Sequence, residues 1–292
     1  MGGMRLAPAS KALEGAVLGW EFAAIVVAGA AIGVLGALLG IGGGVLMVPL
    51  LSVGLGVPIQ SAIAASLVGV IATSCAATGV YLGSRLTNPR LGVTLGIATT
   101  AGGILGGLTG VSIGRELLTI VFAASLLATA VATWVRRDEG ERLAAADREE
   151  GQLGGHFYDP EFGREVRYAV RRLPQGLGLS MLAGVASGLL GIGGGVINVP
   201  SMVLMMDVPV KAAVATSNLM LGFTAVASAF IYYSFGYLDV AVATAVAVGL
   251  FLGSLAGAWR VPRLRGVTIR RALALLLAFV SLLMFLRAAG LY

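Results

Sequence analysis

Residues 38–45 read Leu-Leu-Gly-Ile-Gly-Gly-Gly-Val, and residues 189–196 repeat the same eight residues 151 positions later. The offset of 151 continues without a gap to residue 66, and 15 of the 29 positions from residue 38 are identical in the two copies. The identities outside the glycine cluster include Pro49 and Pro200, Val57-Pro58 and Val208-Pro209, and Ser66 and Ser217. The chain is therefore an internal duplication, with a glycine-rich break at the same place in each half.

The composition indicates an integral membrane protein. The 292 residues are 58% hydrophobic and 12% charged, whereas soluble domains are about a quarter charged. Eight apolar runs are long enough to cross a bilayer as helices. They cover residues 20–39, 60–84, 91–112, 117–135, 175–190, 212–235, 240–259 and 272–291. We expect an all-α fold in which the lipid bilayer is the main partner.

Two further apolar runs, residues 45–57 and 196–208, are too short to span upright. Each directly follows a glycine cluster and carries an early proline, which is typical of broken or re-entrant helices in transporters. Each half then has about five elements, four long transmembrane helices plus one short helix after the glycine cluster. Whether the short segments cross the membrane fully or re-enter it is left open.

The chain divides into an N-terminal transmembrane repeat at residues 1–135, a charged linker at 136–174 and a C-terminal transmembrane repeat at 175–292. The linker mixes both signs of charge, so we expect a solvated segment with helical portions. The lone histidine, His156, lies in this linker and is expected at its surface. The single cysteine, Cys75, excludes an intrachain disulfide and is expected in the core.

The distribution of Lys and Arg among the loops favours inverted repeats. If each half has five elements, the second copy is inverted and a cytoplasmic linker places 16 basic residues inside and 4 outside. Parallel four-helix repeats give a weaker ratio of 13 to 7. We therefore expect a multi-pass protein of the inner membrane with a cytoplasmic central loop. The pI of about 9.9 is then explained by the basic residues of the cytoplasmic loops, and no nucleic-acid partner is expected.

A glycine run that enters a short helix within the membrane can bind an anion. The new helix begins with unpaired N–H groups at the positive end of its dipole, and glycine lets a ligand approach the backbone. Inversion would bring the two clusters together near the midplane. The alternative is close helix packing, which membrane glycines commonly serve. We assign packing to Gly102 and Gly106 and to their copies Gly253 and Gly257.

The candidate substrate-binding residues lie in the two clusters and on the helices that follow. Asn198, whose copy is Met47, is costly in lipid unless it is paired or faces a ligand. For each polar candidate, a hydrogen bond between helices explains the residue as well as a substrate contact does. The candidates are Gly40, Gly42, Gly43, Gly44, Gly191, Gly193, Gly194, Gly195, Ser66, Asn198, Thr216, Ser217 and Asn218.

Several chemistries lack the residues that they require. No charged residue lies near the centre of a long run, so a buried carboxylate relay is not visible. The chain has no P-loop, zinc signature or nucleophile elbow. We expect no enzymatic activity, no cofactor and no metal site.

The paired G-x-G-G-G-x-x-x-x-P elements, residues 40–49 and 191–200, resemble the TauE/SafE family of sulfite and organosulfonate exporters, also called the 4-toluene sulfonate uptake permease family. The resemblance covers nearly all of the chain except the linker. It implies passive or ion-coupled movement of a small anion, such as sulfite, sulfoacetate or another sulfonate, across a prokaryotic inner membrane. The linker looks longer than is usual for the family.

The leading hypothesis is a secondary transporter, with export as its direction, that works by alternating access around a midplane site between two inverted repeats. Two alternatives are kept: a small-anion channel, and a non-transporting membrane subunit or sensor that acts through the cytosolic loop. A coupling ion, H⁺ or Na⁺, and a homodimer are compatible with the leading hypothesis. The sequence leaves the anion, the direction and the coupling ion open.

Overall fold

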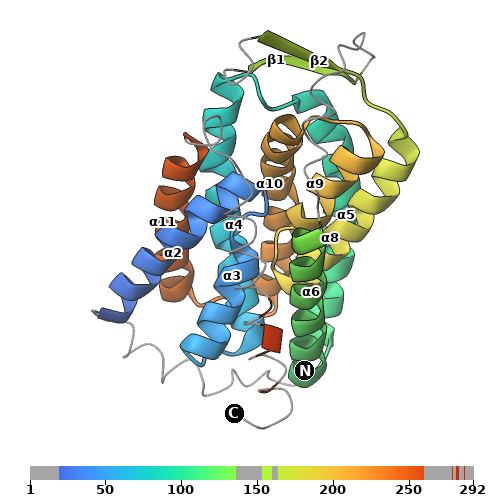
Figure 1. Cartoon of the computed structure of the whole chain (residues 1–292). Helices are drawn as coiled ribbons and strands as arrows, with labels where there is room; N and C mark the ends of the chain where they lie inside the picture. The colour runs from blue at the N-terminus through green and yellow to red at the C-terminus, as the bar shows by residue number, and fades with distance from the viewer. Residues whose placement is uncertain are drawn as a thin grey trace.

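The computed structural model of the chain describes residues 20–135, 153–159 and 164–259, together with Ala278, Ser281, Leu282 and Leu286. Its body is a bundle of long helices, and a two-stranded hairpin lies across one end of the bundle (Figure 1). Six described helices are long and apolar enough to cross a membrane. The prediction of an all-α membrane protein is therefore confirmed.

The elements of the first half are α2 (Trp20–Leu39), α3 (Gly44–Pro49), η1 (Leu50–Gly54), α4 (Ile59–Gly83), α5 (Pro89–Ser112) and α6 (Arg115–Val135). The second half has α8 (Leu173–Leu190), α9 (Gly195–Pro200), η2 (Ser201–Met205), α10 (Val210–Ser234) and α11 (Val240–Ala258). Helix α6 covers the expected run 117–135. Most of the expected run 272–291 lies outside the described residues, although Ser281 there donates a hydrogen bond to the Ala123 carbonyl of α6 (2.8 Å).

The duplication extends from sequence to backbone. The short helices α3 and α9, the π-helical turns η1 and η2, and the helices α4 and α10 have equal lengths and begin 151 positions apart. In both halves the short α-helix ends at a proline and continues as a π-helical turn. Proline has no N–H for the helical ladder, so Pro49 and Pro200 mark the place where α-helical hydrogen bonding changes.

The helices α5 and α11, which each follow a short loop, are capped at equivalent positions. Asn88 accepts a hydrogen bond from the Leu91 N–H (3.1 Å) at the start of α5. Asp239, its copy, accepts from the N–H groups of Ala241 (2.9 Å) and Val242 (3.1 Å) at the start of α11. An Asn or Asp cap satisfies N–H groups that the first turn cannot pair internally.

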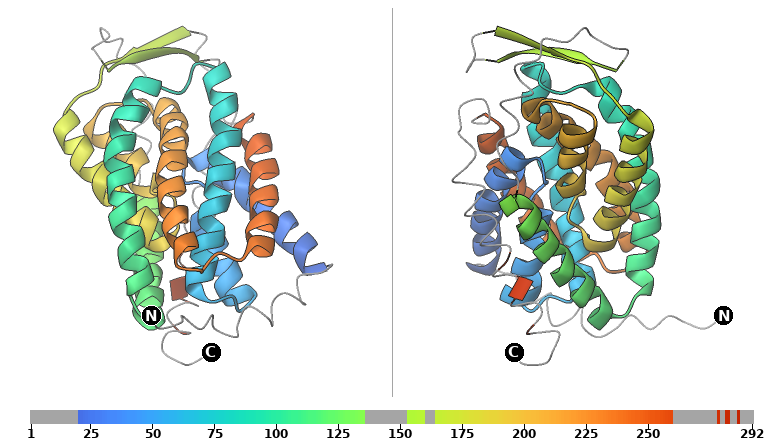
Figure 2. Two further views of the ribbon diagram at one scale, coloured as in Figure 1. Left: turned by 180° about the vertical axis from the view of Figure 1, so that it is seen from behind. Right: turned by 45° about the vertical axis from the view of Figure 1, so that its right-hand side comes forward.

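The two halves are intertwined, because the first long helix of each half lies against the third long helix of the other. Helix α2 packs along α11, and α8 packs along α5 (Figure 2). A Cβ added at Gly102 or Gly106 would meet the main chain of Met181 or Val185, and one at Gly253 or Gly257 would meet that of Ala30 or Val34. The packing role predicted for these four glycines is confirmed.

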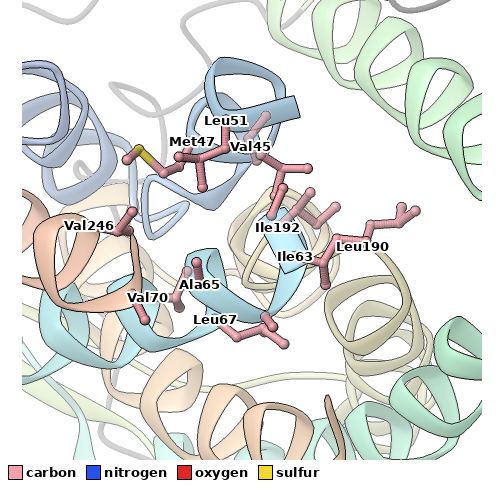
Figure 3. Close-up of a cluster of buried hydrophobic side chains, with 14 of the residues drawn as sticks. Val45, Met47, Leu51, Ile63, Ala65, Leu67, Val70, Leu190, Ile192 and Val246 are labelled. Atoms are coloured by element: carbon pink, nitrogen blue, oxygen red, sulfur yellow. The ribbon is translucent and has the colours of Figure 1, made fainter. Parts of the chain in front are cut away.

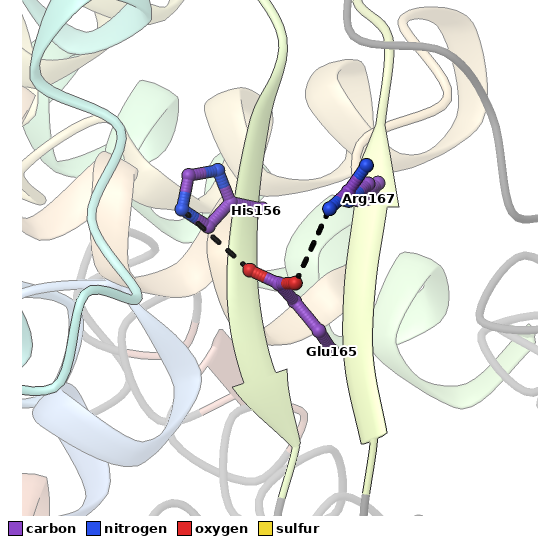
Figure 4. A network of polar contacts seen from close by, with 3 residues as sticks. All are labelled: His156, Glu165 and Arg167. Atoms are coloured by element: carbon purple, nitrogen blue, oxygen red, sulfur yellow. Dashed lines mark hydrogen bonds and ion pairs between the residues drawn. The ribbon is translucent and has the colours of Figure 1, made fainter.

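The linker differs from the sequence-based prediction. Its described part forms an antiparallel hairpin of β1 (Gly155–Asp159) and β2 (Arg164–Tyr168), where no strand was expected. Residues 136–152 and 160–163, where helical portions were also allowed, lie outside the described residues. The apolar residues Val166 and Tyr168 alternate with Glu165 and Arg167, and this period of two suits a strand with one covered face. Phe157, Val166 and Tyr168 are buried. On the outer face, Glu165 lies between His156 and Arg167 (Figure 4).

His156 is thus a surface residue, as expected. The prediction for Cys75 is wrong, because its side chain is exposed on α4 and not in the core. An apolar run around a cysteine does not say which face of the helix carries it.

Candidate functional site

The glycine clusters end one helix and begin another through left-handed backbone. Gly40, Gly42 and Gly43 have φ of 69°, 76° and 75°, and their copies Gly191, Gly193 and Gly194 have φ of 67°, 80° and 68°. Residues with a Cβ rarely adopt these conformations, so glycine is required there. Gly43 and Gly194 are the N-cap residues of α3 and α9, and no side chain caps either helix.

The two clusters touch each other reciprocally. The Ser66 hydroxyl of α4 donates to the Gly191 carbonyl (3.0 Å), and the Ser217 hydroxyl of α10 donates to the Gly40 carbonyl (3.0 Å). A Cβ at Gly44 would collide with the Gly191 carbonyl oxygen, and one at Gly195 with that of Gly40. Each serine therefore satisfies a carbonyl at the break of the opposite half, and each first helical residue packs on that same carbonyl.

Two apolar side chains fill the space between the clusters. A Cβ at Gly42 would lie 2.9 Å from Leu221 Cδ1 and 3.2 Å from Val70 Cγ1. A Cβ at Gly193 would lie 3.2 Å from Val70 Cγ1 and 3.3 Å from Leu221 Cδ2. Val70 and Leu221 are fully buried and are copies of each other at the offset of 151. Val70 belongs to the apolar cluster drawn with Ile63 and Ile192 in Figure 3.

A side chain added at Gly43 or Gly194 would not meet the opposite glycine cluster. At Gly43 it would meet α11, and at Gly194 it would meet α8 of the same half. A Cβ at Gly43 would lie 2.7 Å from Leu250 Cδ2, and one at Gly194 would lie 2.9 Å from the Ala183 carbonyl oxygen. The other six glycines of the candidate set lie where the two breaks meet. The structure thus separates packing positions from contact positions, which the sequence treated alike.

Two of the polar candidates, Asn198 and Asn218, are buried and have an amide oxygen without a hydrogen-bond partner. Asn198 is 2% exposed, and its Oδ1 has no hydrogen-bond partner. The Asn218 side chain is fully buried, donates through Nδ2 to the Val214 carbonyl (2.9 Å), and also has an unpartnered Oδ1. A buried amide oxygen without a partner costs free energy, about 1–3 kcal/mol, and points to a role beyond packing.

Thr216 has a different position from the one expected. Its hydroxyl oxygen accepts a hydrogen bond from the backbone N–H of Asn88 (3.0 Å) at the start of α5. This bond joins α10 to the loop that precedes α5. Proximity to Ser217 in sequence suggested the site, but neighbouring helical residues point in different directions.

Sequence reasoning missed two tyrosines that hold the ends of the broken helices. Tyr81 donates to the Ala37 carbonyl in the last turn of α2 (3.0 Å), and its copy Tyr232 donates to the Leu189 carbonyl in the last turn of α8 (3.2 Å). Both tyrosines are fully buried. The signal in the sequence was their identity at the offset of 151, beyond the stretch of highest similarity.

The surroundings of the site are uncharged. No buried side chain among the described residues carries a formal charge. No group of three or more His, Cys, Asp or Glu residues that could hold a metal ion occurs in the part of the chain that the structure describes. The site therefore offers hydroxyls, amides and backbone dipoles as its polar groups.

Comparison with known proteins places the chain among membrane transporters. The family model described as "Sulfite exporter TauE/SafE" matches residues 25–284. The "Probable membrane transporter protein YunE" of Bacillus subtilis (strain 168) is 24% identical over 251 residues, which cover 81% of this chain and 87% of the relative. No solved structure matches the chain.

Proposed function

This chain belongs to the sulfite exporter TauE/SafE family of membrane transporters, and from that membership we propose that it exports a small anion such as sulfite, sulfoacetate or another organosulfonate. The site is the junction of the two glycine breaks. The observation that carries this proposal is the reciprocal contact between the breaks, where each half supplies both a glycine carbonyl and a serine hydroxyl. A site built equally from two halves suits alternating access, because relative movement of the halves opens it.

The direction of the helices supports an inverted arrangement. Along α5, Gly92, Gly96 and Gly107 meet Leu219, Phe223 and Ile231 of α10 in rising order, so α5 and α10 run parallel. Helix α4 is joined to α5 by a short loop and runs the opposite way (Figure 2). Helices α4 and α10, which are copies of each other, are therefore antiparallel. With the basic residues counted above, this supports inverted repeats in a prokaryotic inner membrane with a cytoplasmic linker.

The polar groups of the junction suit an oxyanion. The first turns of α3 and α9 supply backbone N–H groups and the positive ends of the helix dipoles. The Asn198 and Asn218 amides, which have unpartnered oxygens here, can turn to offer Nδ2 donors. Val70 and Leu221 occupy the space between Gly42 and Gly193. We infer that this conformation is closed, and that binding requires the two side chains to separate.

Transport in proteoliposomes tests the function. Purified protein is reconstituted, and uptake of radiolabelled sulfite, sulfoacetate and sulfate is measured with and without a gradient of H⁺ or Na⁺. A secondary transporter is expected to show counterflow, in which unlabelled anion inside the vesicle drives accumulation of labelled anion. Flux without counterflow would indicate a channel, and absence of flux for every anion would favour a non-transporting subunit.

A matched pair of variants links the flux to the site. Leu219→Ala shortens a side chain of α10 that packs on Gly92. Asn218→Leu removes the adjacent amide. We expect Asn218→Leu to abolish counterflow and Leu219→Ala to retain it. Equal retention in both variants would remove Asn218 from the site.

A further inference from the structure

The linker hairpin is bound to the start of α5 in the first half. Asn88 Nδ2 donates to the Leu153 carbonyl (2.9 Å), to the Gly154 carbonyl (3.3 Å) and to the Tyr168 hydroxyl oxygen (3.2 Å). The Oδ1 of the same side chain caps α5. One amide thus fixes both the first turn of α5 and the base of the hairpin.

The segment that leaves the hairpin is bound to the second half. The Arg171 N–H donates to the Met206 carbonyl (3.2 Å), and the Arg171 guanidinium lies 3.8 Å from the Asp207 carboxylate. Met206 and Asp207 connect η2 with α10, directly after the broken helix. The hairpin segment is therefore attached to a loop of each half.

The covered face of the hairpin belongs to an apolar cluster that both halves supply. Phe157, Val166 and Tyr168 are each 3–4% exposed. Their cluster includes Tyr81, Leu86 and Leu91 of the first half and Met202, Met206 and Val208 of the second half. Figure 1 shows the hairpin lying across the end of the bundle where α4 ends and α5 begins. The contact is a packed apolar interface with hydrogen bonds at both sides.

The equivalent loops of the other repeat have no such cover among the described residues. Met206 is fully buried, whereas its copy Leu55 is 38% exposed. Asn88 bonds to the linker, whereas the hydrogen bonds of its copy Asp239 within the described residues cap its own helix, α11. The duplication therefore builds two similar ends, and the hairpin makes them different.

We propose that the hairpin is a lid that closes the linker-side end of the path between the two halves. Access from this end requires the halves to separate there, and the hairpin holds a loop of each half in one interface. The lid opens when the hairpin leaves the loop between α4 and α5, which contains Asn88, or the loop between η2 and α10, which contains Met206. Closure of this end by the hairpin does not depend on the identity of the ligand. The effect of the hairpin on anion flux does rest on the proposed function.

Thiol labelling tests the closure directly, and the duplication supplies the control. Val208 and Val57 are copies of each other, and they are 0% and 4% exposed. Val208 shares the apolar cluster of the hairpin, and Val57 belongs to the other cluster. Each is replaced by cysteine in a Cys75→Ser background, and the purified protein is treated with a water-soluble methanethiosulfonate reagent.

Two variants release the lid by different routes. The first replaces residues 155–168 with a Gly-Ser linker of equal length. The second is Asn88→Asp, which keeps the oxygen that caps α5 and removes the amide donor to the linker carbonyls. Asp239 shows that an aspartate caps the equivalent helix in this chain. The second variant therefore leaves the helix cap intact and remains informative if the first fails to fold.

We expect both variants to raise the labelling rate of Val208→Cys at least about tenfold and to leave that of Val57→Cys unchanged. Unchanged labelling of Val208→Cys in both variants would overturn the proposal, and so would an equal rise at both positions, which would indicate general loosening. A second arm joins Arg171→Cys to Asp207→Cys with a short bis-methanethiosulfonate reagent, which links the two thiols through disulfide bonds that a reductant cleaves. We expect counterflow to fall at least fivefold and to return on reduction. If labelling follows the expectation while no variant transports an anion, the lid stands and the proposed function fails.

Discussion

Ser66 of α4 donates a hydrogen bond to the carbonyl oxygen of Gly191, which lies 125 residues away in the other half of the chain. Ser217 makes the same bond to Gly40 in the opposite sense. A helix that stops inside a membrane leaves carbonyl groups without water or backbone partners. The duplicated serine supplies that partner across the junction, so each half completes the break of the other.

Removal of either serine hydroxyl should destabilise the protein. In Ser66→Ala or Ser217→Ala, a buried carbonyl loses its side-chain partner, and we expect a loss of about 1–3 kcal/mol in the free energy of unfolding. Ser234→Ala is the control, because that exposed hydroxyl bonds only within α10. Denaturant unfolding in detergent measures the effect. Equal stability of Ser217→Ala and Ser234→Ala would contradict a role for the junction bond.

Alanine at Gly44 or Gly195 should prevent close contact of the two breaks. The added methyl group would collide with the carbonyl oxygen of Gly191 or Gly40, and main-chain atoms cannot move aside as a flexible side chain can. We expect a loss of folded protein in size-exclusion chromatography after purification. Gly79→Ala is the control, because a Cβ there meets nothing within 4 Å. That variant should be neutral or gain about 0.5–1 kcal/mol from helix propensity.

Asn198→Met should separate ligand binding from stability. Methionine is the residue at the equivalent position, Met47, and it removes a buried amide oxygen that has no partner. We expect the melting temperature without ligand to stay equal or rise, and the increase caused by sulfite or sulfoacetate to disappear. A lower melting temperature together with a preserved ligand shift would assign Asn198 to packing.

Shortening Leu221 should open the closed junction. Leu221→Ala removes most of one of the two side chains that fill the space beside Gly42 and Gly193, at a cost of about 2–5 kcal/mol in stability. We expect faster efflux of anion without a counter-substrate, measured in proteoliposomes. Val226→Ala, on the exposed face of the same helix, is the control. Unchanged efflux in the folded Leu221→Ala protein would place the barrier elsewhere.

The sequence predicted the candidate site in part. It identified Gly40 and Gly191 as the breaks and Ser66 and Ser217 as their polar neighbours. It also placed Thr216 at the site, whereas that hydroxyl contacts Asn88, and it predicted no strands in the linker, where a hairpin forms. The strands are short and charged on one face, so their pattern is hard to distinguish from a solvated loop. Tyr81 and Tyr232 were missed because a tyrosine in an apolar run gives no sign of its partner.

The sequence by itself determined that the chain spans a membrane, that it is duplicated and that a helix breaks once in each half. These properties depend on the length of apolar runs, on identity at a fixed offset and on the local conformations of glycine and proline. Only the tertiary structure decided which half completes which break, that Val70 and Leu221 fill the junction, and that the hairpin covers one end. Those contacts join residues far apart in the chain, and their formation depends on the relative placement of whole helices.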